Sequence, residues 1–183
     1  SPIPFEYLAV ELVTGCASLL AFLYSPNCLY AFMHFCLAAL LSIVFLYDLH
    51  YQIIPDWTVV GLILLTILFH LQGGILKHLG GGLLTGLASS IFFLLLHLIT
   101  RGRGMGLGDV KYAFFMGLFL GWPEILVGLY TAFLTGAAVG VILLLLNKKK
   151  FGQHVAFGPF LVLGTFTAWF WGQKIISLFN SYL

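Results

Sequence analysis

The sequence predicts an all-α protein, a polytopic bundle of about seven transmembrane segments that forms a single transmembrane domain over residues 1–183. Three observations support this fold class. Hydrophobic residues make up 61% of the chain and charged residues only 8%, whereas a soluble domain carries roughly 25% charged residues. Apolar runs of about 17 to 25 residues recur, long enough to cross the hydrocarbon layer of a bilayer. Basic residues gather in alternate loops. We therefore expect lipid, and no nucleic acid, as a partner of the protein surface.

The predicted segments are separated by turn-forming residues. The first is ended by Ser25-Pro26-Asn27, the third stops before Gly73-Gly74, and Gly121-Trp122-Pro123 separates the fifth from the sixth. Pro and Gly interrupt helices, so these breaks define the segment ends. In order, the segments cover about 7–24, 29–47, 56–71, 81–100, 110–120, 124–146 and 157–179. The fifth is shorter than the others.

Basic residues provide an independent check on this topology. If the first segment leaves the cytoplasm, the loops after the second, fourth and sixth segments are cytoplasmic. These loops, or positions just beyond them, contain Arg101, Arg103, Lys111, Lys148, Lys149 and Lys150. Only Lys77 and Lys174 lie elsewhere. The positive-inside rule therefore supports seven crossings, with the N-terminus in the cytoplasm.

Small residues and cysteines have structural interpretations. Gly128, Gly136 and Gly140 lie four and eight positions apart in the sixth segment, a spacing that allows close helix packing. The cysteines form no CxxC pair and have no histidine at metal-ligand spacing, so neither a disulfide framework nor a metal site is predicted from them. The three cysteines are Cys16, Cys28 and Cys36.

Acidic residues are few, and the topology narrows the candidates among them. Glu6 and Glu11 belong to the entry of the first segment, and Glu124 follows Pro123 as a partner for the dipole at a helix start. The remaining three are all predicted to lie at the cytoplasmic membrane boundary. They are Asp48, Asp56 and Asp109. A carboxylate near hydrocarbon is costly unless it is paired or used, so these residues are candidates for a functional site.

Two carboxyl groups from different helices at one depth provide what an aspartyl protease needs. Repulsion raises the pKa of one group so that a single proton is held between them, leaving one base for a water and one acid for the carbonyl oxygen. Asp109 is the first candidate, and Asp48 is the second because the dipole at a helix C-terminus disfavours its charge. Asp56 also fits a helix cap or first-turn acid. For Asp48 and Asp109, structural pairing with Lys111 or Arg103 is the alternative.

Glycines directly precede Asp109 in the stretch GLGD. Gly106 and Gly108 there allow a backbone with φ > 0, or the close approach of an extended peptide. Two further glycines precede them, so a phosphate-binding loop is the competing interpretation. No strand precedes this run and no GKS or GKT closes it, so neither nucleotide-binding fingerprint is present.

Three stretches, taken together and in order along nearly the whole chain, resemble the bacterial type IV prepilin peptidases, which belong to the GxGD class of intramembrane aspartyl proteases. They are YDLHYQIIPD (47–56), GLGDVK (106–111) and FGPF (157–160). The resemblance implies that Asp48 and Asp109 are the catalytic pair. It implies that Pro55, Asp56, Gly106 and Gly108 support the site or bind substrate, and that Lys111 tunes Asp109 or steadies the substrate.

The same resemblance implies an activity. Members of this family remove the short basic leader from type IV prepilins and pseudopilins, after a glycine, at the cytoplasmic face of the bacterial plasma membrane. The expected partners are the N-terminal segments of these substrates, which serve type IV pili and type II secretion, and proteolysis needs no cofactor. A second family activity, N-methylation with S-adenosylmethionine, is linked largely to an N-terminal helix and a cytoplasmic zinc module. Neither has a counterpart in this sequence, which would fit a truncated or naturally short relative, so the sequence leaves methylation and its cofactor S-adenosylmethionine open.

Other functions compete with this one. A presenilin-like GxGD protease also carries a YD and a GxGD motif, but it would have nine helices and a Pro-Ala-Leu motif, which this sequence lacks. A small proton or cation transporter would use Asp48 and Asp109 in a cavity, and it would be expected to contain inverted repeats. A metal hydrolase would use Asp48, His50 and Asp56, but this spacing does not specify a coordination geometry.

Overall fold

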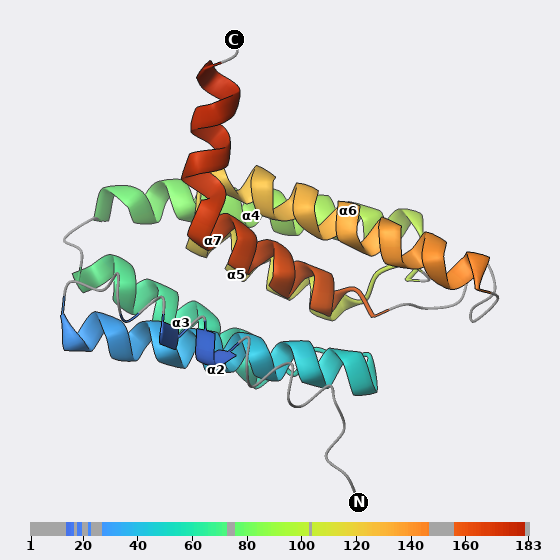
Figure 1. Cartoon of the computed structure of the whole chain (residues 1–183), viewed down its shortest axis with the longest axis horizontal. Helices are drawn as coiled ribbons and strands as arrows, with labels where there is room; N and C mark the ends of the chain where they lie inside the picture. Colours follow the sequence, from blue (N-terminus) through green and yellow to red (C-terminus); the bar gives the residue numbers. More distant parts are fainter. Residues whose placement is uncertain are drawn as a thin grey trace, which may run out of the picture.

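The computed structural model describes residues 14–16, 18–19, 22, 27–72, 76–102, 104–146 and 156–181. All elements of this part are helices, which confirms the all-α prediction (Figure 1). Five helix starts lie within three residues of their predicted positions, whereas the fourth begins five residues earlier than predicted. The first predicted segment, 7–24, lies mostly outside the described residues. The helices are α2 (Cys28–Tyr51), α3 (Asp56–Gln72), α4 (Leu76–Ile99), α5 (Leu107–Leu120), α6 (Glu124–Leu145) and α7 (Gly158–Ser181).

The helices stack in three layers of two (Figure 1). One outer layer holds α2 and α3 and the middle layer holds α7 and α5; on the other side α6 packs on α7 and α4 packs on α5. The middle layer supplies much of the core, including the fully buried Tyr112, Phe115 and Leu161. The hydroxyl groups of Tyr112 and Thr165 lie 3.0 Å apart in a hydrogen bond that joins α5 to α7. The layering therefore places the two middle helices between the outer pairs.

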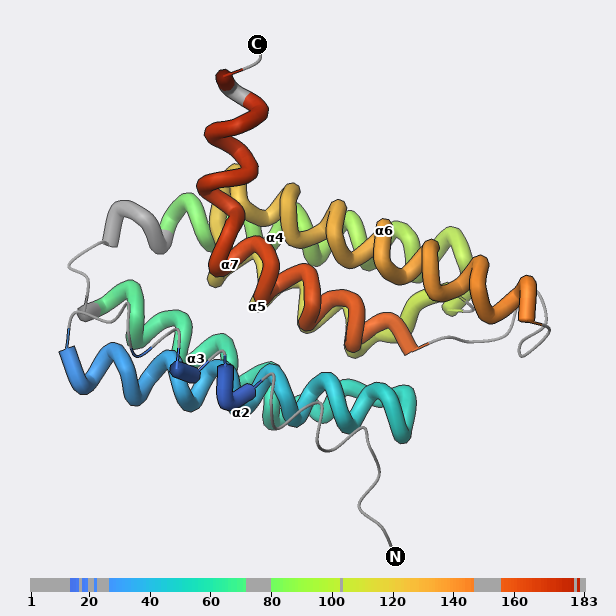
Figure 2. The backbone as a smooth tube through the Cα atoms, in the orientation of Figure 1, coloured from blue at the N-terminus to red at the C-terminus, as the bar shows by residue number. Residues whose placement is uncertain are grey.

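Within the described part of the chain, three helices are long and apolar enough to cross a membrane: Cys28–Tyr51, Gly80–Ile99 and Glu124–Leu145. The chain is therefore a membrane protein, as its composition predicts. Helix α5 has 14 residues, about 21 Å at 1.5 Å per residue, which is short of a bilayer core of roughly 30 Å. The last turns of α7 diverge from the stack (Figure 2).

Close packing of α6 against α7 uses two of the three glycines predicted for it. A Cβ on Gly128 would lie 3.2 Å from the carbonyl oxygen of Gly164, and one on Gly136 would lie 3.1 Å from the Phe157 ring. At Gly140 a Cβ would meet nothing within 4 Å. The prediction is wrong for this glycine because Phe160, in the first turn of α7, packs against Gly136 and nothing approaches the next turn of α6 at Gly140.

Candidate functional site

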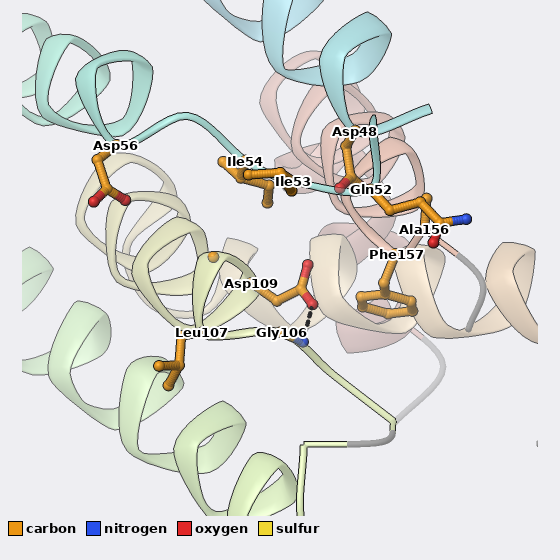
Figure 3. Close-up of a pocket in the computed structure, with 11 residues that line it drawn as sticks. Asp48, Gln52, Ile53, Ile54, Asp56, Gly106, Leu107, Asp109, Ala156 and Phe157 are labelled. Carbon is orange, nitrogen blue, oxygen red and sulfur yellow. Dashed lines mark hydrogen bonds between the residues drawn. The ribbon is translucent and has the colours of Figure 1, made fainter. Parts of the chain in front are cut away.

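One end of the bundle gathers the C-terminus of α2 and the N-termini of α3, α5 and α7. A cavity of about 320 Å³ opens among these helix ends. Asp48 from α2 and Asp109 from α5 face it, although they lie far apart in the sequence (Figure 3). Its lining residues are Asp48, Gln52, Ile53, Ile54, Asp56, Gly106, Leu107, Gly108, Asp109, Ala156 and Phe157. The cavity thus unites the three aspartates and both glycines that the sequence singles out.

Asp48 lies in the last turn of α2 and is only 4% exposed. The helix runs to Tyr51, one turn beyond its predicted end, and closes at Gln52 in the left-handed conformation (φ 55°). The Gln52 N–H donates to the Asp48 carbonyl oxygen at 2.8 Å. The Asp48 side chain accepts a separate bond, from the Gly158 N–H to Oδ2 at 2.8 Å. The first residue of α7 therefore contacts the carboxyl group of α2.

Asp109 is the third residue of α5 and is 7% exposed. The Gly106 N–H donates to its Oδ2 at 2.9 Å, which is the side-chain half of a capping box at the helix start. Asp109 precedes the apolar part of α5 and lies outside the three membrane-spanning helices. Burial raises the pKa of Asp109 to about 6, the Gly106 bond opposes this rise, the charge of Asp48 adds to it and His97 lowers it. This carboxyl group therefore binds a proton more readily than an exposed aspartate does.

The alternative pairing of the two buried aspartates with a basic side chain is partly tested. Lys111 forms its ion pair with Asp56 instead, with Nζ 2.7 Å from Oδ1. Arg103, the other proposed partner, lies outside the described residues. The charge of Asp48 raises the pKa of Asp109, so the two buried carboxyl groups act on one another.

Asp56 is the first residue of α3, as predicted for a first-turn acid. It lies at the side of the cavity (Figure 3), and its side chain and that of Lys111 are 71% and 51% exposed. The carbonyl oxygen of Pro55 accepts the N–H groups of Thr58 and Val59 and so starts the helix. Pro55 and Asp56 therefore connect the start of α3 to α5 beside the cavity.

The structure tests one of the two predictions about the GLGD glycines. The prediction of a φ > 0 backbone is wrong for Gly106, whose φ of −81° and ψ of 161° are extended because it is the N-cap of α5. The close approach of an extended peptide stays a prediction; at Gly108 a Cβ would lie 3.1 Å from the Ile54 Cβ. The neighbour that approaches is therefore the chain's own connection between α2 and α3.

The sequence reasoning missed His97 and gave Gly158 no role. His97 Nδ1 lies 2.7 Å from the Met105 carbonyl oxygen, so the side chain ties the C-terminal part of α4 to the loop before Asp109. An ionisable residue inside the apolar run 81–100 could have drawn attention to His97. No local signal indicated that Gly158 would reach Asp48.

The residues proposed for a metal hydrolase do not gather. Among the side chains that the structure describes, no three from His, Cys, Asp and Glu lie close enough to hold a metal ion. His50 is exposed, and its Nδ1 lies 3.0 Å from the Leu46 carbonyl oxygen. The arrangement in the cavity is instead a facing pair of carboxyl groups.

The pKa of Asp109 gives a prediction about stability. Because the folded state raises this pKa to about 6, ionisation of Asp109 destabilises the native protein as the pH rises from about 4 through 6. Asp109→Asn cannot ionise, so we expect its Tm to match that of the unmodified protein near pH 4 and to exceed it by roughly 5 °C above pH 7. Thermal unfolding in detergent across this pH range measures the difference. A gap that stays constant with pH would contradict the burial of an ionisable Asp109.

Residues 35–141 match the profile of the Type IV leader peptidase family. The chain is 33% identical over 188 residues to a prepilin leader peptidase/N-methyltransferase of Legionella pneumophila, covering 100% of the chain and 64% of that relative. Relatives of the same name in Aeromonas hydrophila and Bacillus subtilis are each 30% identical, with 61% and 71% of their lengths covered. The chain spans less than two thirds of the Legionella and Aeromonas relatives. No solved structure matches it.

Proposed function

Because the chain belongs to the type IV leader peptidase family, we propose that it is a membrane aspartyl endopeptidase that removes the leader peptide from type IV prepilins or pseudopilins. The observation that carries this proposal is the facing pair of buried carboxyl groups, Asp48 and Asp109, in one cavity. Lys111, one of the two basic residues in the alternative of a structural pairing, forms its ion pair with Asp56. A shared cavity and a raised pKa are what an acid–base pair requires.

In this proposal the two aspartates hold one proton between them. The ionised carboxylate removes a proton from water, whose oxygen attacks the peptide carbonyl carbon, while the protonated carboxyl group gives its proton to the carbonyl oxygen. The resulting tetrahedral diol collapses as the C–N bond breaks: one hydroxyl gives its proton to the ionised carboxylate, and the carboxyl group that was protonated by water gives its proton to the leaving amine nitrogen. The proton-sharing state is restored, and no cofactor takes part.

The cavity also suits the substrate. Its volume of about 320 Å³ lies at the lower end of the range for ligand pockets, which is enough for a short extended stretch of peptide. Ile54 and Phe157 wall the space around the carboxyl groups (Figure 3). A glycine next to the scissile bond places no side chain in this space, which supports cleavage after glycine.

We place the cavity at the cytoplasmic face of the plasma membrane. Arg101 and Lys111 lie at the end of the bundle that holds this cavity. Lys174 lies at the other end, where it lines a separate cavity with Glu124 at the start of α6. The larger number of described basic residues at the first end agrees with the positive-inside rule. Leu107 is exposed at the cavity. A cysteine placed there should react with a membrane-impermeant maleimide in inside-out vesicles and not in intact cells, and the reverse pattern would contradict this orientation.

The cavity does not fit S-adenosylmethionine. Two buried carboxyl groups suit its positively charged groups, but the described lining contains no basic side chain for its carboxylate. Lys111, which is near, is bound to Asp56. Our proposal therefore concerns proteolysis alone.

Cleavage of a prepilin peptide tests the proposal. We expect the purified protein to release the leader after glycine, with a rate that a metal chelator does not change. A peptide in which leucine replaces this glycine is the matched control and should be cleaved at least tenfold more slowly. Failure to cleave the glycine peptide, or loss of cleavage with the chelator, would reject the aspartyl mechanism.

The Asp56–Lys111 pair should matter less than the buried carboxyl groups. Both side chains are largely exposed, and exposed ion pairs contribute at most about 1 kcal/mol. We expect Asp56→Asn and Lys111→Met each to lower kcat/KM by less than about tenfold, and the double variant to be no worse than either single one. Measuring kcat/KM for the two single variants and the double variant shows whether the effects of the two substitutions depend on one another. Complete loss of cleavage in Asp56→Asn would instead make Asp56 essential.

A further inference from the structure

The first turn of α7 has one backbone donor that its own helix start does not use. The first N–H groups of a helix have no carbonyl partner within it. In α7, the N–H groups of Phe160 and Leu161 donate to the Phe157 carbonyl oxygen at 3.0 and 3.2 Å, and Pro159 has no N–H. The N–H that remains is that of Gly158, and it donates to Asp48 Oδ2 at 2.8 Å. Asp48 therefore caps a helix that begins more than a hundred residues later.

Glycine is required here by space and not by backbone conformation. Positive-φ glycines in the described chain are Gly102 and Gly121, so Gly158 does not need a left-handed backbone. A Cβ at this position would lie 2.5 Å from Asp48 Oδ2 and 2.8 Å from its Cγ. Such distances are shorter than any real contact of a Cβ atom. A side chain at position 158 and the observed position of the Asp48 carboxyl group are therefore incompatible.

We propose that Gly158 is a positioning residue for the cleavage reaction: its N–H fixes one oxygen of the Asp48 carboxyl group, and its missing side chain makes that contact possible. This inference rests on the proposed role of Asp48 as one of the catalytic pair. Each residue of the stretch FGP (157–159) then has a role at the site. Phe157 walls the cavity and supplies a carbonyl oxygen, Gly158 holds Asp48, and Pro159 leaves no competing donor beside it.

The variant Gly158→Ala tests this role. Its methyl group would displace the Asp48 carboxyl group, and a misplacement of about 1 Å in a catalytic group costs on the order of 100-fold in rate. We expect kcat to fall by about 100-fold while KM stays within about threefold, because the other walls of the cavity are unchanged. Gly140→Ala is the matched control, since a Cβ there meets nothing within 4 Å, and it should change neither constant.

A thermal-unfolding cycle tests the contact without any substrate. With Asp48 present, Gly158→Ala should lower the Tm by roughly 3 to 6 °C because of the collision. In the Asp48→Ala background the two closest contacts are gone and only the Cβ of residue 48, at 3.0 Å, remains, so the same change should lower the Tm by less than half as much. Should Gly158→Ala alone fail to fold, a folded double variant would establish the same dependence on Asp48.

The two measurements separate failure of this inference from failure of the proposed function. A Gly158→Ala protein that keeps kcat within threefold would overturn the positioning role. An equal Tm loss with and without the Asp48 side chain would overturn it as well, since the contact would then not be the cause. If the unmodified protein cleaves no prepilin peptide, the proposed function fails, and the Tm cycle still decides whether Gly158 fixes Asp48.

Discussion

Asp48→Asn and Asp109→Asn are each expected to abolish cleavage of a prepilin peptide, with kcat lowered by roughly 10² to 10⁴-fold, the range for loss of a general acid or base. An amide has nearly the shape of a carboxyl group but neither removes a proton from water nor donates one as an acid. Its oxygen can still accept the Gly158 N–H at position 48 or the Gly106 N–H at position 109. The loss should therefore come from chemistry and not from unfolding.

Cleavage kinetics and thermal unfolding of the same preparations provide the measurement. Glu124→Gln is the matched control, because it makes the same change of carboxylate to amide at the first residue of α6, away from the cavity. It should cleave at the rate of the unmodified protein. Full cleavage by either Asp48→Asn or Asp109→Asn would rule out the catalytic pair, whatever the activity of the other variants.

Gly117→Ala is expected to lower the stability of the protein strongly. Gly117 lies where α5 crosses α4, and a Cβ there would lie 2.6 Å from the Thr85 carbonyl oxygen and 2.7 Å from the Gly86 Cα. Both neighbours are backbone atoms, so the helices would have to separate. Overpacking of this kind costs about 1 to 3 kcal/mol, and α5 carries Asp109. We expect the Tm to fall by roughly 5 °C and kcat to fall with it.

Thermal unfolding of the detergent-solubilised protein measures the change in Tm. Gly140→Ala makes the same substitution in α6 where nothing lies within 4 Å, and it should leave the Tm unchanged or slightly raised, since alanine is the better helix former. Equal behaviour of the two variants would show that the close approach of α4 and α5 does not limit stability.

Much of the fold is predictable because helix positions in a membrane protein depend on local properties of the chain. The apolar runs, the proline after Trp122 and the pair Pro55-Asp56 place most helix starts within three residues. The end of α2 was misplaced, because its apolar run stops at Tyr47 whereas its backbone closes at Gln52 in a left-handed conformation. Hydropathy reports where side chains become polar, and it does not report where the backbone hydrogen bonds end.

The sequence by itself determined that this is a helical membrane protein, and it identified Asp48, Asp56 and Asp109 as the acids of interest. A charge at the edge of an apolar run is costly wherever the helix packs, so these candidates can be identified from local sequence. Only the tertiary structure decided which groups meet: Asp48 with Gly158, Lys111 with Asp56, and Asp109 within range of the charge of Asp48. Such contacts depend on how three layers of helices pack side by side, and the spacing of residues along one chain does not specify that packing.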